Sequence, residues 1–475
     1  MKRFVIFAIL VTAGMLFSAG GSGAFSSRVS TSSAAAGYVG PLGSASASEN
    51  SAAHATFRFA NPSAASNISP AFWGVDVLAN YPFNSTNATH LARTPISYLR
   101  FPGGALGEEF NYTSGVITRP TGNTYNATTS IQQFVNSCNL IRCHAILQLP
   151  AEINQSETAA YYATYVVQTL HFQPAYWEIG NTVPGWSHFG VPWSNWSTQT
   201  GAAITPLVFA RLAGTYISAV KTVDPNASFI ALGAGMGRPG YDQAWITNLT
   251  LVDGHNLSGI SVHSYTMGAG PANPTWPELL SNLNGQYSLP DQVTADRNYI
   301  AAACPSCSTS IFVTEANAAE VGNFTSLVST FAGTLYVAAD TAQALNLRLT
   351  NLDWFCFACN YSGSWEGPSN LGTMQYALYE KMMTRLGTQL LASNLTGPAT
   401  LYAAATYGPH GYALLLVNVN MTQSVSINIG HSGIVLGGTA DRERWSNGSS
   451  APHSTALTLG KYLLVPALTI EIITF

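Results

Sequence analysis

Charged residues are scarce in this chain. Only 8% of its 475 residues are Asp, Glu, Lys or Arg, whereas globular domains usually carry about a quarter. The 18 basic residues are scattered, and the net charge is −4. The chain therefore lacks the basic surface that a nucleic acid needs, which argues against that partner. Solubility must come from Ser, Thr, Asn and Gln, and from sugar on the many Asn-x-Ser/Thr acceptors, so we expect a glycoprotein.

A long apolar run occurs at the N-terminus and nowhere else. Lys2 and Arg3 precede apolar residues 4–17, and small residues fill 18–24. This order is typical of a secretory signal peptide, which we expect to be residues 1–24. An uncleaved membrane anchor is the alternative, but the run is short for a bilayer. We expect a secreted, extracellular protein with no membrane span after cleavage; association with the cell surface stays open.

The six cysteines fall in three close pairs, Cys138/Cys143, Cys304/Cys307 and Cys356/Cys359. In an exported chain such pairs predict disulfides. A zinc site formed by the two C-x-x-C pairs is the alternative. One of those pairs precedes a predicted strand and the other follows one, so they should lie at opposite ends of a barrel. We therefore expect no metal site.

Short apolar segments alternate with helical ones over residues 71–388. Strands are predicted at 72–78, 98–101, 144–149, 176–180, 229–233, 259–263, 311–314 and 347–355, and helices at 158–170, 206–223, 291–303, 324–344 and 371–386. Eight strand–helix units are the pattern of a (β/α)₈ (TIM) barrel, an α/β fold. An open doubly wound sheet is the runner-up, but no Gly-rich phosphate loop opens the first helix.

The barrel is flanked by segments of different character. Residues 25–54 are rich in Ser and Ala and predict a flexible linker. Residues 389–475 contain alternating or apolar runs at 401–406, 411–418, 424–429 and 461–475, separated by turn residues. These predict an antiparallel β-sandwich. Residues 55–70 would supply one more strand to that sandwich.

Polar side chains end several of the predicted barrel strands, and in a parallel barrel those ends form the active face. They are Arg100, Asn181, His263, Tyr265, Glu315 and Trp354. Arg and Tyr can hold a carboxylate ionised and aimed at a carbon centre. A Trp ring can stack on the apolar face of a sugar. The set suits attack on an anomeric carbon. Each residue also has a purely structural interpretation, as an ion pair, a loop cap or core.

The motifs resemble a known clan of enzymes. Trp-Glu-Ile-Gly-Asn at 177–181, His-x-Tyr at 263–265, Thr-Glu at 314–315 and Leu-Arg-Phe-Pro-Gly-Gly at 99–104 are similar to those of the (β/α)₈ retaining glycoside hydrolases, in their arabinofuranosidase, β-xylosidase and heparanase-like β-glucuronidase branches. The resemblance implies that Glu315 is the nucleophile and that Arg100 and Tyr265 hold it. Asn181 would contact the sugar 2-hydroxyl.

The resemblance further implies that Trp354 floors the subsite where cleavage occurs, with His263 among the substrate-binding residues. The substrate would be an oligo- or polysaccharide, and no cofactor is needed.

The chain departs from this pattern at position 182, where the clan has the general acid/base Glu and this sequence has Thr182. A hydroxyl is too weak an acid to protonate a leaving oxygen. Glu178 lies four residues earlier, about 13 Å down a regular strand. We expect Glu178 to be a buried structural acid.

A proton donor could come from Glu108, Glu109 or Glu366 instead, or be dispensable for good leaving groups. The sequence therefore predicts a glycoside hydrolase with a non-standard or missing acid. The alternative is a catalytically inactive carbohydrate-binding or cell-surface glycoprotein.

Overall fold

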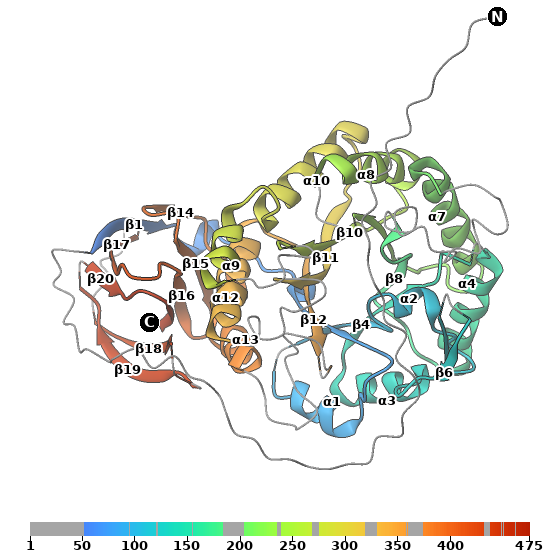
Figure 1. The fold of residues 1–475 in the computed structure, drawn as a ribbon, viewed down its shortest axis with the longest axis horizontal. Helices are drawn as coiled ribbons and strands as arrows, with labels where there is room; N and C mark the ends of the chain where they lie inside the picture. Colours follow the sequence, from blue (N-terminus) through green and yellow to red (C-terminus); the bar gives the residue numbers. More distant parts are fainter. Residues whose placement is uncertain are drawn as a thin grey trace, which may run out of the picture. The chain divides into compact units, whose positions relative to one another are not determined.

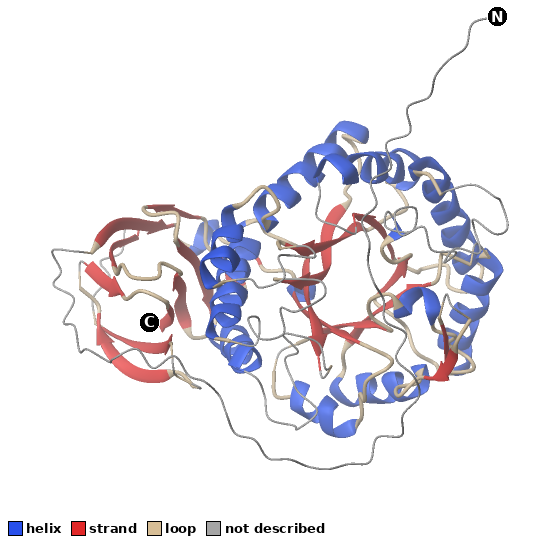
Figure 2. Cartoon of the chain, in the orientation of Figure 1, coloured by secondary structure: helices blue, strands red, loops and turns tan. Residues whose placement is uncertain are grey.

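Eight parallel strands close into a barrel that is ringed by helices (Figures 1 and 2). The computed structural model describes residues 52–94, 96–119, 122–153, 155–183, 204–234, 239–267, 275–318, 330–357, 359, 374–431, 438–447, 449, 451–460 and 462–475. The predicted (β/α)₈ fold is confirmed. The expected signal peptide and nearly all of the expected linker lie outside the described residues. No helix within the described ranges is long and apolar enough to span a membrane.

The barrel strands are almost wholly buried, because helices cover one face and barrel side chains fill the other. In spatial order they are β10 (Gly259–Tyr265), β11 (Ser310–Asn317), β12 (Asn351–Phe357), β3 (Trp73–Val77), β4 (Tyr98–Phe101), β7 (His144–Leu149), β8 (Tyr176–Ile179) and β9 (Phe229–Ala234). The sequence-based bounds of β4 and β7 are confirmed to the residue. β12 begins four residues later than predicted, at Asn351.

Helices follow the strands on the outside of the barrel. They are α1 (Ser85–Leu91), α2 (Leu106–Glu109), α3 (Ile131–Ile141), α4 (Ser156–Ala163), α7 (Pro206–Lys221), α8 (Pro239–Asp253), α9 (Trp276–Ser281), α10 (Leu289–Ala303), α12 (Phe331–Asn346) and α13 (Met374–Arg385). Local signals fix several starts. Ser130 and Gln133 form a capping box at α3, and Thr205 caps α7, whose first residue is proline.

A short hairpin, β5 (Val116–Thr118) and β6 (Thr124–Asn126), lies between α2 and α3 in the chain. A π-helical turn at Thr164–Thr169 continues α4. The hairpin is absent from the sequence-based predictions, whereas the π-helical turn lies within the helix predicted at 158–170.

The C-terminal strands form two sheets. One has the order β14 (Ser393–Thr396), β1 (Ala53–Phe59), β17 (Val425–His431), β20 (Tyr462–Val465). The other has the order β19 (His453–Thr458), β18 (Thr439–Ser446), β21 (Thr469–Thr474), β16 (Gly411–Asn418), β15 (Leu401–Gly408), β13 (Gln389–Leu390), β2 (Ser66–Asn67).

The first strand of the described chain is thus part of this C-terminal sheet domain, as predicted. β1 pairs in parallel with β17 and antiparallel with β14. It starts at Ala53, two residues inside the stretch predicted as linker. Phe57 and Ile427 are fully buried in the core between the sheets.

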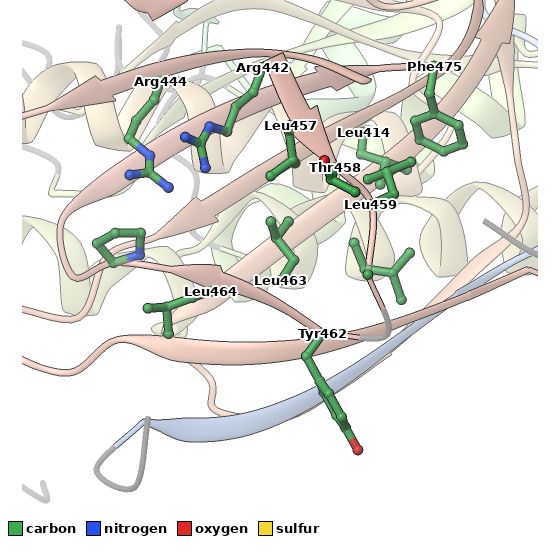
Figure 3. A pocket seen from close by; sticks show the side chains of 13 residues that line it. Leu414, Arg442, Arg444, Leu457, Thr458, Leu459, Tyr462, Leu463, Leu464 and Phe475 are labelled. Atoms are coloured by element: carbon green, nitrogen blue, oxygen red, sulfur yellow. The ribbon is translucent and has the colours of Figure 1, made fainter. Parts of the chain in front are cut away.

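At the edge of this domain a cavity of about 300 Å³ has an apolar lining that includes Leu414, Leu463 and Phe475, with Arg442 and Arg444 on one side (Figure 3). Arg444 pairs with Glu471.

The barrel and the sheet domain form one compact unit, Ala47–Phe475. Asn346 at the end of α12 donates to the carbonyl oxygen of Ala403 in β15 over 2.8 Å. Arg385 at the end of α13 pairs with the buried Glu443 of β18 over 2.7 Å. The interface therefore combines apolar packing with a partly buried ion pair.

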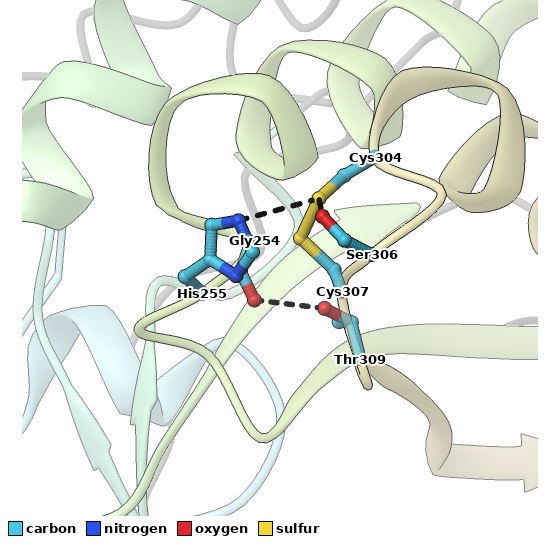
Figure 4. The surroundings of a disulfide bond; sticks show 6 residues. All are labelled: Gly254, His255, Cys304, Ser306, Cys307 and Thr309. Carbon is cyan, nitrogen blue, oxygen red and sulfur yellow. Dashed lines mark hydrogen bonds between the residues drawn. A yellow bond between two sulfur atoms is a disulfide. The ribbon is translucent and has the colours of Figure 1, made fainter.

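The predicted disulfides are confirmed as Cys138–Cys143, Cys304–Cys307 and Cys356–Cys359. His255 Nε2 lies 3.8 Å from Cys304 Sγ (Figure 4). His255, Cys304 and Cys307 are near enough to one another to hold an ion, but both sulfurs are in a disulfide. The zinc alternative needs four thiolates, and none is available from these cysteines.

Candidate active site

The carboxyl ends of β10 and β11 bring three of the predicted site residues together. His263 of β10 lies opposite Glu315 of β11, and the register shifts just before His263. Such irregularities re-aim side chains at the rim of a barrel. Tyr265 is two residues beyond His263 and therefore points to the same side of the strand. The side chains of His263 and Tyr265 therefore both reach Glu315 on the neighbouring strand.

Glu315 accepts hydrogen bonds on both carboxylate oxygens. Arg100 Nη1 donates to Oε1 over 2.8 Å, and the Tyr265 hydroxyl donates to Oε2 over 2.7 Å. His263 Nε2 lies 3.5 Å from Oε1. The Glu315 side chain keeps 7% of its surface exposed. The carboxylate is thus fixed in direction, and a small part of the side chain is exposed.

The surroundings of Glu315 favour its ionised form. Burial would raise the pKa of its carboxyl, but His263, Arg100 and the Tyr265 hydroxyl together hold that pKa below its usual value. Burial also lowers the pKa of His263, so its ring is neutral at pH 7. Arg100 and Tyr265 are therefore the groups that keep Glu315 charged at that pH.

Arg100 is the centre of the network and is completely buried. Besides Glu315, its guanidinium donates to Glu178 Oε2 over 2.5 Å, Asp76 Oδ1 over 3.1 Å and Asn181 Oδ1 over 2.9 Å. Burial raises the pKa of Asp76 well above its usual value, against the attraction of Arg100. One guanidinium thus faces three carboxyl groups.

Glu178 is fully buried, as expected of a structural acid, and accepts from Arg100 and from Thr314 Oγ1 over 2.9 Å. Its hydrogen bond with Arg100 Nε helps to fix the position of the guanidinium.

Asn181 and Thr182 form a sharp turn at the end of β8. Gly180 and Thr182 have φ angles of 79° and 48°, a left-handed conformation that is unfavourable for a β-branched Thr. Asn181 Nδ2 donates to Thr182 Oγ1 over 2.9 Å, while Asn181 Oδ1 accepts from Arg100. Asn181 therefore connects Thr182 to Arg100 and, through Arg100, to Glu315.

Glu108 stabilises the same turn through a hydrogen bond to its backbone. Its carboxylate accepts from the backbone N–H of Asn181 over 2.6 Å and from that of Glu152 over 2.8 Å. Burial, with repulsion from Glu152, raises the pKa of Glu108 well above its usual value. Glu109 pairs with Arg119 over 3.0 Å. These two acid candidates are thus engaged in structural contacts.

Trp354 is completely buried in β12 and packs edge-on against Tyr336. Its role as the floor of a sugar subsite stays a prediction. Glu366, the remaining acid candidate, lies outside the described residues.

Sequence reasoning missed two polar groups within the site, Asp76 and Gln148, and one beside it, Glu152. Asp76 lies inside the apolar strand β3, one residue before its end, so it does not stand out as a strand-end residue. Gln148 donates to Asn181 Oδ1 over 3.2 Å from inside β7. Glu152 follows β7 by three residues, and its position after a strand end was the signal that could have identified it.

The comparisons with known proteins find the same fold in solved (β/α)₈ glycoside hydrolases. A GH51 arabinofuranosidase from Xanthomonas axonopodis pv. citri is 13% identical, with a TM-score of 0.72, over 89% of this chain and 99% of that one. An α-L-arabinofuranosidase from Thermotoga maritima is 14% identical, with a TM-score of 0.72 and the same coverage. A GH family 44 endoglucanase from Clostridium thermocellum is 13% identical, with a TM-score of 0.64, over 89% of this chain and 100% of that one.

One characterised relative is recognisable by sequence. An intracellular exo-α-L-arabinofuranosidase from Bacteroides ovatus is 25% identical in an alignment 186 residues long that covers 36% of this chain and 35% of the relative. The match thus spans about a third of that relative. No protein-family model matches the chain.

Proposed function

We propose that the protein is a secreted glycoside hydrolase of retaining ancestry that acts on a β-linked or arabinofuranosyl glycan, with Glu315 as nucleophile. The observation that carries the proposal is the state of Glu315. Its carboxylate is held by Arg100 and Tyr265 at the active end of the barrel, and its pKa is lowered despite burial. An ionised, aimed and accessible carboxylate is the group needed for attack on an anomeric carbon.

In the first step a Glu315 oxygen bonds to the anomeric carbon while the glycosidic bond breaks and the leaving oxygen takes a proton. In the second step the water oxygen bonds to the anomeric carbon as the bond to Glu315 breaks, and the water proton passes to the group that protonated the leaving oxygen or, where no such group acts, to solvent. Arg100 and Tyr265 orient the carboxylate through both steps, and Asn181 contacts the sugar 2-hydroxyl. Thr182 stands where the clan has its proton donor, so the proton comes from another group, or the enzyme acts only on substrates whose leaving group needs none.

The test compares the wild-type protein with Glu315→Gln. A glutamine keeps the volume but cannot form a stable glycosyl ester, so turnover should be lost while sugar binding is retained. The matched control is Glu157→Gln, which alters an exposed carboxylate on α4 and should leave turnover unchanged. Undiminished turnover by Glu315→Gln would overturn the proposal.

A second function, binding of carbohydrate without hydrolysis, is favoured by Thr182 alone. Aryl glycosides with an acidic phenol, assayed with and without azide, separate the two. Turnover of these compounds alone, accelerated by azide, indicates a nucleophile without its acid. Turnover of natural glycans indicates a proton donor elsewhere. No turnover of either compound, with sugar still bound, supports the binding role.

Export is part of the proposal. Three disulfides support an oxidising compartment, and residues 1–24 have the composition of a signal peptide. Sequencing the N-terminus of protein recovered from the culture medium tests it; a mature protein that still starts at Met1 would contradict cleavage.

A further inference from the structure

A second polar cleft lies beside the candidate active site. It has a volume of about 460 Å³ and is lined by residues that follow β4 and β7, including Glu108, Glu109, Arg119, Glu152 and Tyr162. The elements around it, α2, the β5–β6 hairpin and α4, lie in one region of the barrel (Figure 1). They belong to the active end, because they follow the carboxyl ends of parallel strands.

The three carboxyl groups of this cleft differ in their partners. Glu108 accepts from backbone N–H groups on both of its oxygens, and Glu109 is paired with Arg119. Glu152 is only 5% exposed, yet within the described residues its Oε1 has no hydrogen-bond partner. A buried polar atom without a partner costs free energy, which a ligand that supplies the partner would recover.

The charge state of the cleft indicates what kind of ligand fits. Burial, with repulsion from Glu109, raises the pKa of Glu152 to about 8, and burial raises that of Glu108 well above its usual value. Glu109 is balanced by Arg119, and the pKa of Tyr162 is raised to about 12. With a pKa of about 8, Glu152 is mostly protonated near pH 7, so that it can both donate and accept hydrogen bonds. A sugar hydroxyl also donates and accepts, so it is a suitable partner for a protonated carboxyl group. A cation would instead need an ionised carboxylate.

The cleft is tied to the nucleophile candidate by a short chain of contacts. The Glu108 carboxylate binds the amides of both Glu152 and Asn181. Asn181 then contacts Arg100, and Arg100 contacts Glu315. Glu152 and the turn at Asn181–Thr182 are thus held next to each other by one side chain.

We propose that this cleft binds a neutral sugar residue of the glycan at a distance from the bond that is cleaved, and that Glu152 hydrogen-bonds a hydroxyl of that sugar. Glu152 is then a specificity-determining residue that makes the protein bind oligosaccharides more tightly than monosaccharides. The inference rests on the proposed function insofar as the ligand is a glycan; it does not require that Glu315 be the nucleophile.

The test is calorimetric titration of Glu315→Gln protein, which prevents turnover, with arabinotriose, xylotriose and cellotriose and with the corresponding monosaccharides. Adding Glu152→Ala should weaken binding of the preferred trisaccharide about tenfold, the loss expected for one hydrogen bond, and leave monosaccharide binding unchanged. Glu152→Gln keeps a donor and an acceptor and should stay within about threefold. Glu157→Gln, on the neighbouring helix, is the matched control and should change nothing.

A pH series adds a readout that a merely structural role would not produce. Trisaccharide affinity should fall above pH 8 as Glu152 loses its proton, and the fall should be absent in Glu152→Gln. Equal loss for trisaccharide and monosaccharide, unchanged trisaccharide affinity in Glu152→Ala, or no trisaccharide binding at all would overturn the inference. Wild-type turnover is measured separately, so a failure of the proposed hydrolysis would be recognised independently of these titrations.

Discussion

Removing the Tyr265 hydroxyl should shift the pH dependence of catalysis by a calculable amount. In Tyr265→Phe the ring remains, but Glu315 Oε2 loses a donor at 2.7 Å in a buried setting. A hydrogen bond to a charged group contributes about 1.5–3 kcal/mol, and 1.36 kcal/mol corresponds to one pKa unit. The pKa of Glu315 should therefore rise by about one to two units.

The direction follows from which form the hydroxyl stabilises. In the native protein the pKa of Glu315 is depressed, so the active, ionised form persists to low pH, and the stability gained from ionisation is lost only as pH falls through that depressed value. In Tyr265→Phe the acidic limb of kcat/KM should move toward neutral pH by the same one to two units. The assay is the pH profile with an activated aryl glycoside.

The control is Tyr402→Phe, which removes another buried tyrosine hydroxyl, bonded to Asn284 near the sheet domain, and should leave the profile unmoved. An acidic limb that stays within about 0.3 pH units of wild type in Tyr265→Phe would refute the reasoning, because this shift is far smaller than the hydrogen-bond energy allows.

Three further predictions address the surrounding structure. Arg100→Met leaves three carboxyl groups without their buried cation and should lower the free energy of unfolding by about 3–5 kcal/mol in denaturant titrations; a loss below 1 kcal/mol would contradict the central place of Arg100. Thr182→Glu should raise kcat on natural glycans at least tenfold, since a positioned acid contributes about 10²–10⁴; a correctly folded variant without any gain would show that the turn no longer aims a side chain at the leaving oxygen. Replacing Cys138 and Cys143 together by alanine opens a very short loop and should cost about 2 kcal/mol; unchanged stability would mean that this disulfide does not restrict the unfolded chain.

The barrel was largely predictable because its strands are buried on both faces. Such strands appear as continuous apolar runs bounded by turn residues, which is how 98–101 and 144–149 were located to the residue. Five of the described strands of the sheet domain were missed, and three of them, β2, β13 and β14, have at most four residues. β18 carries Asp441, Arg442, Glu443 and Arg444, and β19 is mostly exposed, so neither shows an apolar run.

The site was predictable where a polar residue ends an apolar strand, as Arg100, Asn181 and Glu315 do. The sequence did not predict that Glu315 and Asn181 both bind the guanidinium of Arg100. Contacts between residues far apart in the chain depend on how the barrel closes and on the register of its strands. Glu152 escaped notice for a related reason. Its importance comes from an oxygen without a partner, a property of packing and not of sequence.

The most direct test of the central claim is to trap the glycosyl-enzyme bond. A 2-fluoro glycoside with a good leaving group should acylate the protein slowly and stably, and peptide mass mapping should place the sugar on Glu315 in the segment that includes Phe312–Asn317. A sugar attached to another carboxylate, or activity toward the parent glycoside without any adduct, would contradict the account.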